Sequence, residues 1–157
     1  MHFTIQYPSN HSLEEHEYRP GDRILFDSHN PNGRNVGLEI SYATGGMPND
    51  HSFSDALLNA SVGNVPTENI EGYGDNVITK IADLTINGHR AVHATFFRKG
   101  GIYQEPRFCE SYIVVKDSNS DYLLDACTTN ATYEGAKAEV TQYSSLMEQI
   151  VNTFMIY

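Results

Sequence analysis

Apolar and polar residues alternate with a period of two in several short stretches of this chain, which is the pattern of strands that bury one face. The segments 3–7 and 24–26 both show it. The longest example has apolar residues at every second position, namely Val36, Leu38, Ile40 and Tyr42. These stretches predict a fold that contains a β-sheet.

The clearest hairpin spans residues 77–97, with Asn87-Gly88 at its turn. This dipeptide favours a two-residue turn because both central positions take positive φ. The register set by the turn makes three cross-strand pairs: Ile86 with His89, Leu84 with Ala91, and Ile78 with Phe97. Both faces of the hairpin carry apolar side chains, so we expect helices or long loops to cover the sheet on both sides.

Two stretches have helical periodicity. Ser52 and Asp55 have the Ser-x-x-acid spacing of a helix start, and an apolar stripe follows them. A second stripe runs through residues 143–154. Ser145 with Glu148 forms a capping box for this helix, but the stripe also permits an earlier start. The prediction is an α+β fold: a central antiparallel β-sheet flanked by helices on both faces, an α/β/α sandwich.

The length of 157 residues predicts a single domain, residues 1–157, with one sizeable core. Ten Lys and Arg against twenty Asp and Glu give a net charge of −10, which repels nucleic acid and anionic membranes. Cations and basic protein surfaces are the better partners. No apolar run reaches the ~20 residues of a membrane helix. Because strand residues begin at Phe3, we expect any export signal or membrane anchor to lie upstream of this sequence.

The two cysteines fall in a second predicted hairpin, on either side of the turn 116–120. Pairing Val115 with Asp121 places Cys109 opposite Cys127, and directly opposed residues of an antiparallel pair approach to ~4.5 Å between Cα atoms. A disulfide between Cys109 and Cys127 is feasible at that distance. The alternative is two reduced, packed cysteines in a cytosolic protein, and the sequence leaves both open.

The same turn carries the candidate metal ligands Asp117, Asn119 and Asp121. Their alternate spacing matches the first half of a calcium-binding loop, because calcium is held by oxygen ligands. The glycine and the glutamate that complete such a loop are missing, so a solvated turn with Asx-type hydrogen bonds is the competing interpretation. Calcium is the only cofactor that the residues suggest.

The sequence gives weaker support for other metal, cation or catalytic sites. His89 and His93 have an i, i+4 spacing, yet on an extended strand they stand ~13 Å apart and do not share one ion. The acidic run 14–17 is interpreted as a solvated loop that can attract cations. No nucleophile elbow, phosphate-binding glycine loop or zinc-protease motif occurs in the sequence. We therefore expect no catalytic residues, although His and carboxylate side chains can still assemble a site from loops such as 63–76.

The order of these elements resembles the PsbP-like family, which comprises the extrinsic photosystem II subunit and its non-photosynthetic relatives. The resemblance extends over nearly the whole chain and rests on diffuse packing and turn patterns. The segments that carry it are Phe3-Thr4-Ile5-Gln6-Tyr7-Pro8-Ser9, Asn87-Gly88-His89-Arg90-Ala91, Tyr122-Leu123-Leu124-Asp125-Ala126 and the closing residues 147–156. It implies an antiparallel sheet with helices on both faces, the same layers that the hydrophobic pattern predicts.

The resemblance also implies a non-enzymatic accessory role. Photosynthetic members of the family help to retain calcium and chloride at a manganese cluster, distant relatives bind a small GTPase, and many others are exported. We accordingly expect an extracytoplasmic or secreted domain that engages a protein partner, or a divalent cation such as calcium, through surface loops. The alternatives are a small hydrolase with a His and carboxylate site in the loops, and a cytosolic GTPase-binding adaptor.

Overall fold

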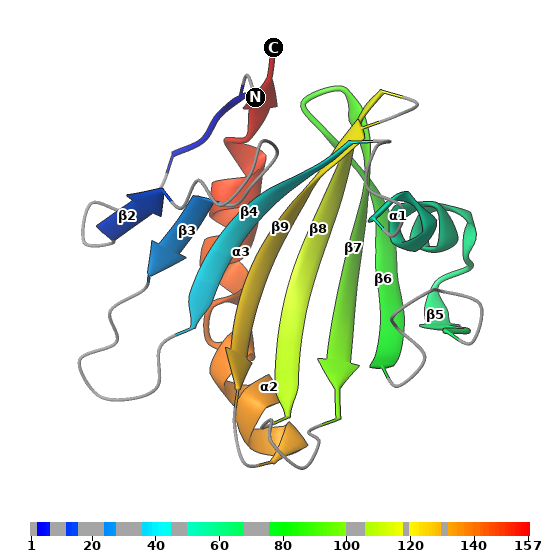
Figure 1. The fold of residues 1–157 in the computed structure, drawn as a ribbon, viewed down its shortest axis with the longest axis vertical. Helices are drawn as coiled ribbons and strands as arrows, with labels where there is room; N and C mark the ends of the chain where they lie inside the picture. Colours follow the sequence, from blue (N-terminus) through cyan, green and yellow to red (C-terminus); the bar gives the residue numbers. More distant parts are fainter. Residues whose placement is uncertain are drawn as a thin grey trace.

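The architecture was obtained as a computed structural model that describes residues 3–6, 12–15, 24–27, 36–44, 50–67, 76–99, 106–117, 120–129 and 132–157. Its main feature is an antiparallel sheet of eight described strands in the order β2-β3-β4-β9-β8-β7-β6-β5 (Figure 1). These strands are β2 Ser12–Glu15, β3 Ile24–Asp27, β4 Gly37–Thr44, β5 Gly63–Val65, β6 Asn76–Ile86, β7 His89–Arg98, β8 Arg107–Asp117 and β9 Ser120–Thr129. A separate two-stranded ribbon joins β1 (Phe3–Thr4) to β10 (Met155–Ile156).

Helices cover both faces of the sheet, as predicted. Helix α1 (Asp50–Asn59) lies on one face, and helices α2 (Tyr133–Thr141) and α3 (Ser144–Asn152) lie on the other (Figure 1). None of the helices in the described part of the chain has the length and apolar character that a membrane crossing requires.

The period-two pattern divides the apolar side chains between two cores. In β8, Tyr112 and Val114 belong to the core beneath α2 and α3, whereas Ile113 belongs to the core beneath α1. The first core is completed by Val140, Met147 and Val151 of the helices and by Phe154, which follows α3. The second is completed by Leu57 and Leu58 of α1. A sheet that is apolar on both faces therefore has the two covers that the sequence required.

The β6–β7 hairpin turns at the predicted dipeptide, where Asn87 and Gly88 have φ angles of 48° and 87°. The predicted pairing of Leu84 with Ala91 is confirmed. Further along the strand the prediction was wrong, because Ile78 lies opposite Phe96 rather than Phe97. The reason is a β-bulge between Lys80 and Ala82, which adds one residue to β6 and shifts the register beyond it.

The helices differ from the predicted ones in three places. Helix α1 begins at Asp50, two residues before the predicted start at Ser52. Helix α2 was not predicted; it begins after Thr132, whose side chain accepts a hydrogen bond from the backbone N–H of Gly135. Helix α3 begins at Ser144, one residue before the predicted capping-box serine Ser145, and its N-cap residue Tyr143 makes no side-chain capping bond. The predicted loop 63–76 contains the short strand β5, and its residues 68–75 lie outside the described ranges.

Candidate functional site

A cavity of about 410 Å³ lies between α3 and strands β6, β7 and β8. Its polar lining comes mainly from His93 of β7, Glu110 and Tyr112 of β8, and Ser144 and Glu148 of α3. Its apolar lining includes Leu84, Ile86 and Val151. The cavity therefore combines several convergent polar groups with apolar walls, which is the usual composition of a ligand site.

Strand register explains why these groups meet. Glu110 and Tyr112 are two residues apart in β8 and so point to the same face, toward α3. His93 lies directly opposite Tyr112 on the neighbouring strand β7. The two rings are stacked, with centroids 4.3 Å apart and planes inclined by 4°. The sheet thus presents an imidazole, a phenol and a carboxylate side by side beneath the helix.

Glu110 is the centre of this group and is only 6% exposed. Its Oε1 atom lies 2.9 Å from Nε2 of His93 and 3.5 Å from the donating hydroxyl of Tyr112. Its Oε2 atom accepts a hydrogen bond from the Ser144 hydroxyl at the start of α3. Three side chains from three elements therefore hold the carboxylate, which fits the rule that a buried charge must be paired.

The electrostatics of the cavity follow from this pairing. Burial raises the pKa of the Glu110 carboxyl, but hydrogen bonds from His93 and Ser144 and the charge of the His93 ring outweigh it, so the pKa lies below its ordinary value of 4.5. Burial, followed by the negative charges of Glu110 and Glu148, raises the pKa of Tyr112 well above its ordinary value of 10.0. Glu110 is therefore an anion at neutral pH, and Tyr112 remains a neutral hydroxyl.

The arrangement of Ser144, Glu110 and His93 differs from that of a catalytic serine nucleophile and its histidine base. The Ser144 hydroxyl donates to the carboxylate of Glu110 and not to the imidazole of His93. A serine nucleophile needs a base that removes its proton, and in Ser-His-acid sites that base is the imidazole. The geometry instead suits the orientation of His93 and the retention of a buried negative charge beside the cavity.

The sequence did not predict this site, because its members are far apart along the chain. His93 was considered only as a metal ligand with His89, and His89 instead bonds through Nδ1 to the carbonyl oxygen of Val115 at 3.1 Å. One signal was present: Glu110 and Tyr112 continue the inward positions of β8 that also hold Phe108 and Val114. A glutamate in the apolar phase of a strand indicates a buried, paired carboxylate.

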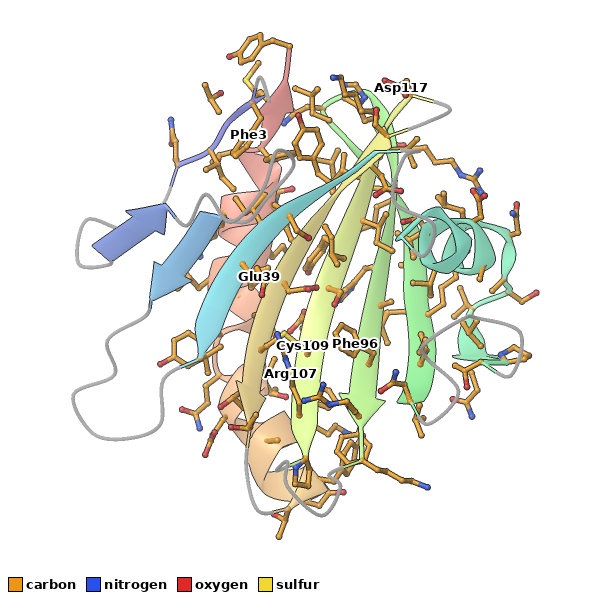
Figure 2. All side chains as sticks on the ribbon, viewed as in Figure 1. Phe3, Glu39, Phe96, Arg107, Cys109 and Asp117 are labelled. Atoms are coloured by element: carbon orange, nitrogen blue, oxygen red, sulfur yellow. A yellow bond between two sulfur atoms is a disulfide. The ribbon has the colours of Figure 1, made fainter. Side chains whose placement is uncertain are left out.

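The candidate calcium ligands lie elsewhere. Asp117 is exposed at the end of β8, Asp121 is 3% exposed in β9, and Asn119 lies outside the described residues. Figure 2 shows Asp117 at one end of the sheet, well away from Cys109. Within the described ranges, no group of three or more His, Cys, Asp and Glu residues is arranged to hold a metal ion. Calcium binding at this turn stays a prediction.

The structure also tests the predictions made for the two cysteines and for the acidic run 14–17. The predicted register places Cys109 opposite Cys127, and the structure joins their sulfur atoms in a disulfide, with the Cα atoms 4.2 Å apart. The bridge lies on the α1 face, away from the cavity. Of the acidic run, Glu14 and Glu15 belong to strand β2 rather than to a loop, and residues 16–17 lie outside the described part of the chain.

Comparison with known proteins shows the fold alone. No protein-family model matches the sequence, and no curated protein sequence matches it. Among solved structures, the chain is similar to cyanobacterial PsbP from Synechocystis, with 15% identity and a TM-score of 0.56, over 99% of this chain and 86% of that one. It is also similar to LpqN, which is involved in cell envelope biogenesis of Mycobacterium tuberculosis, with 16% identity and a TM-score of 0.55, over 98% and 82% of the two chains.

A third similar structure is PA94, a Pseudomonas aeruginosa protein of unknown function, with 12% identity and a TM-score of 0.54, over 100% of this chain and 99% of that one. At such low identities these proteins share an architecture with this chain, and a shared architecture does not transfer a function. The chain therefore has the PsbP-like fold, an antiparallel sheet with helices on both of its faces.

Proposed function

We propose that this chain is a non-enzymatic binding or accessory domain that acts outside the cytoplasm and recognises a positively charged group of a protein partner at the cavity beneath α3. The observation that carries the proposal is the pair of carboxylates at this cavity. Glu110 is buried and held as an anion, and Glu148 lies on the exposed side of α3. With a net charge of −10 on the chain, the long-range field also favours basic partners.

The apolar walls of the cavity narrow the class of ligand. Leu84, Ile86 and Val151 can pack against a hydrocarbon stem, while the carboxylates attract the charge at its end. Lysine combines these two properties, because its aliphatic stem packs on apolar surface and its ammonium group stays at a polar site. A lysine side chain of a protein partner is therefore the ligand that the lining fits best.

The disulfide supports the proposed compartment. Bonds such as Cys109–Cys127 persist in oxidising compartments and are rare in the cytosol. The link of the similarly folded LpqN to cell envelope biogenesis is compatible with a role outside the cytoplasm. The same bond argues against the cytosolic GTPase-binding adaptor.

The proposal can be tested with Nα-acetyl-lysine amide, which carries a free side-chain ammonium, by following backbone and His93 ring signals in NMR titrations. We expect shifts confined to the cavity. Glu148→Gln should weaken binding about threefold, the range of an exposed ion pair. Glu134→Gln removes the same charge from an exposed position of α2 outside the cavity and should leave affinity unchanged. Equal shifts with the corresponding glutamate derivative, or no cavity shifts, would contradict the proposal.

A second candidate function, a small hydrolase, is favoured by one observation. The His93 ring is oriented by Glu110 and lines the cavity, and within the described residues its Nδ1 atom has no hydrogen-bond partner. An imidazole oriented by a carboxylate can act as a general base toward water. Ester hydrolysis that disappears in His93→Gln and persists in His89→Gln would establish this function instead. We expect both variants and the wild type to hydrolyse the ester at the same low rate.

A further inference from the structure

One long border of the sheet has no neighbouring strand among the residues that the structure describes. Strand β5 is the last described strand on that side of the sheet, and it pairs only with Ile78–Lys80 of the much longer β6 (Figure 1). Within the described residues, the stretch Ala82–Ile86 of β6 pairs with β7 on one side only. Its other side is therefore an open edge of the described sheet, and such an edge is a template for a further strand.

The turn defines which backbone groups face outward. In a two-residue hairpin the residues that flank the turn, Ile86 and His89, form a hydrogen-bonded pair, and the pattern repeats at Leu84. The N–H and C=O groups of the intervening residues Asp83 and Thr85 must then point away from β7. They form a short row of outward donors and acceptors.

The cavity reaches this open edge. Leu84 and Ile86 line it with their side chains on the α3 face. Thr85 also lines it, although Thr85 lies opposite Arg90, whose guanidinium reaches Leu58 of α1 on the other face. The contribution of Thr85 is therefore its backbone, at the border of the strand. A strand added here would direct every second side chain to the α3 face, over the cavity.

Exposed side chains also occur elsewhere on β6 and just before β5. Val77 and Ile81 of β6 are 47% and 43% exposed, and Val62, just before β5, is 63% exposed. The bulge at Ile81 and the exposed charge of Asp83, whose side chain is 59% exposed, oppose pairing between two copies of an acidic chain.

We propose that an extended segment of the protein partner adds to the outer edge of β6 at Asp83 and Thr85 and places a lysine side chain over the cavity, toward Glu148. This inference rests on the proposed function and adds the mode of binding to it. Backbone hydrogen bonds would supply affinity and the cavity would supply selectivity, as in other complexes formed by strand addition.

The probe is a short acetylated peptide of alternating valine and threonine with one central lysine. At saturation we expect the amides of Asp83 and Thr85 to exchange with solvent about tenfold more slowly, while the amides that face β7 keep their rates. Replacing the central lysine by glutamate should lower the affinity at least about fivefold. A peptide whose backbone nitrogens are methylated along the edge that faces β6 cannot donate hydrogen bonds to β6 and should not bind.

Matched variants test the backbone contact. Thr85→Pro removes one outward N–H and leaves the bonds to β7 intact, because proline is tolerated on the solvent side of an edge strand. It should abolish peptide binding, whereas Thr85→Val, which keeps the backbone N–H, should bind the peptide like the wild type. The N-methylated peptide provides the same test on the wild-type chain if the proline variant does not fold.

The outcomes separate the two proposals. Cavity shifts with the lysine derivative, combined with unprotected Asp83 and Thr85 amides in the peptide complex, would overturn strand addition and leave the proposed function standing. An absence of cavity shifts with either probe would overturn both. Protection of these amides in the free protein at high concentration, with a dimer in sedimentation, would show that a second copy occupies the edge and would also overturn the proposal.

Discussion

Both faces of the sheet bury charged side chains, and Lys80 on the α1 face is used differently from Glu110 on the α3 face. On the α1 face, Lys80 is 1% exposed, and its Nζ atom lies 2.8 Å from the carbonyl oxygen of Ala60 and 2.9 Å from Oδ1 of Asp83. Arg90 makes a similar bond to the carbonyl oxygen of Leu58, at 2.6 Å. Because α1 has no basic residue in its last turn, the sheet supplies the cations that satisfy the helix C-terminus.

On the α3 face, the buried charge is Glu110, and its three donors come from side chains on β7, β8 and α3. These contacts hold the carboxylate but leave a cavity beside it. The comparison teaches that a buried charge does not by itself mark a site. Lys80 caps the C-terminal end of α1, whereas Glu110 lies beside a cavity that another molecule can enter.

The largest expected effect tests whether the two faces are independent. Replacing both cysteines, Cys109→Ala with Cys127→Ala, removes a cross-link between residues with a sequence separation of 18 and should lower the free energy of unfolding by about 3 kcal/mol. Urea denaturation measures this loss, and the wild type in reductant should match it. Because the bridge lies on the α1 face, the NMR signals of His93 should stay in place. A lost affinity for the lysine derivative would show that the faces are coupled.

The next test concerns the structural charge. Lys80→Met keeps most of the side-chain volume but removes the hydrogen bond to the carbonyl of Ala60. A hydrogen bond to a charged group contributes roughly 1.5–3 kcal/mol, so we expect a loss of about 2 kcal/mol in urea denaturation. Lys99→Met, at an exposed position, is the matched control and should change stability by less than about 0.5 kcal/mol. If Lys80→Met instead weakened lysine binding at the cavity, the assignment of Lys80 to the fold alone would be wrong.

The stabilising effect of the Glu110 carboxylate should depend on pH. The pKa of Glu110 is lower in the folded chain than in the unfolded one, so the unfolded state binds more protons in acid. The contribution of this carboxylate to stability is present above its ordinary pKa of 4.5, which we take for the unfolded chain, and is lost as the pH falls through the folded value.

Glu110→Gln should therefore cost about 1.5 kcal/mol at neutral pH, because its three donors lose a charged acceptor. The cost should shrink as the pH falls below about 4. Stability curves of the variant and the wild type at several pH values measure this, with Glu134→Gln as the control of equal charge. Parallel curves in acid would mean that Glu110 titrates as it does in the unfolded chain.

Local pairing could be predicted from the sequence, and long-range assembly could not. The register of the hairpin that joins Cys109 to Cys127 depends on a short turn, so the alternation of apolar residues was enough to set it. The bulge at Ile81 left no composition signal, and its effect appeared only as a shifted partner for Ile78. Helix α2 was missed because its buried stripe is short, with only Ala136 and Val140 fully inside.

The site was out of reach for a related reason. Ser144 lies 34 residues from Glu110 along the chain, and their contact depends on where α3 docks on the sheet. Neither residue belongs to a local motif, so pattern and spacing carried no information about the pair. The fold class followed from periodicity that many residues share, whereas the cavity depends on a few side chains placed by tertiary packing.

The smallest expected effect concerns the Tyr112 phenol at the cavity, which should influence stability at alkaline pH. The hydroxyl of Tyr112 is 3.5 Å from Glu110, a long hydrogen bond, so Tyr112→Phe should cost less than about 1 kcal/mol at neutral pH. Because the pKa of Tyr112 is raised in the folded chain, the folded state keeps its proton more firmly than the unfolded state does. Its contribution is fully present below the unfolded pKa of about 10 and is lost as the pH rises above it.

Tyr112→Phe should therefore flatten the alkaline limb of the stability curve, and Tyr157→Phe, at a residue that is 68% exposed, should leave it unchanged. An alkaline limb that is identical in the wild type and Tyr112→Phe would mean that neither burial nor the carboxylates of Glu110 and Glu148 raise the pKa of this phenol, and the negative potential on which lysine recognition depends would be weaker than the lining indicates.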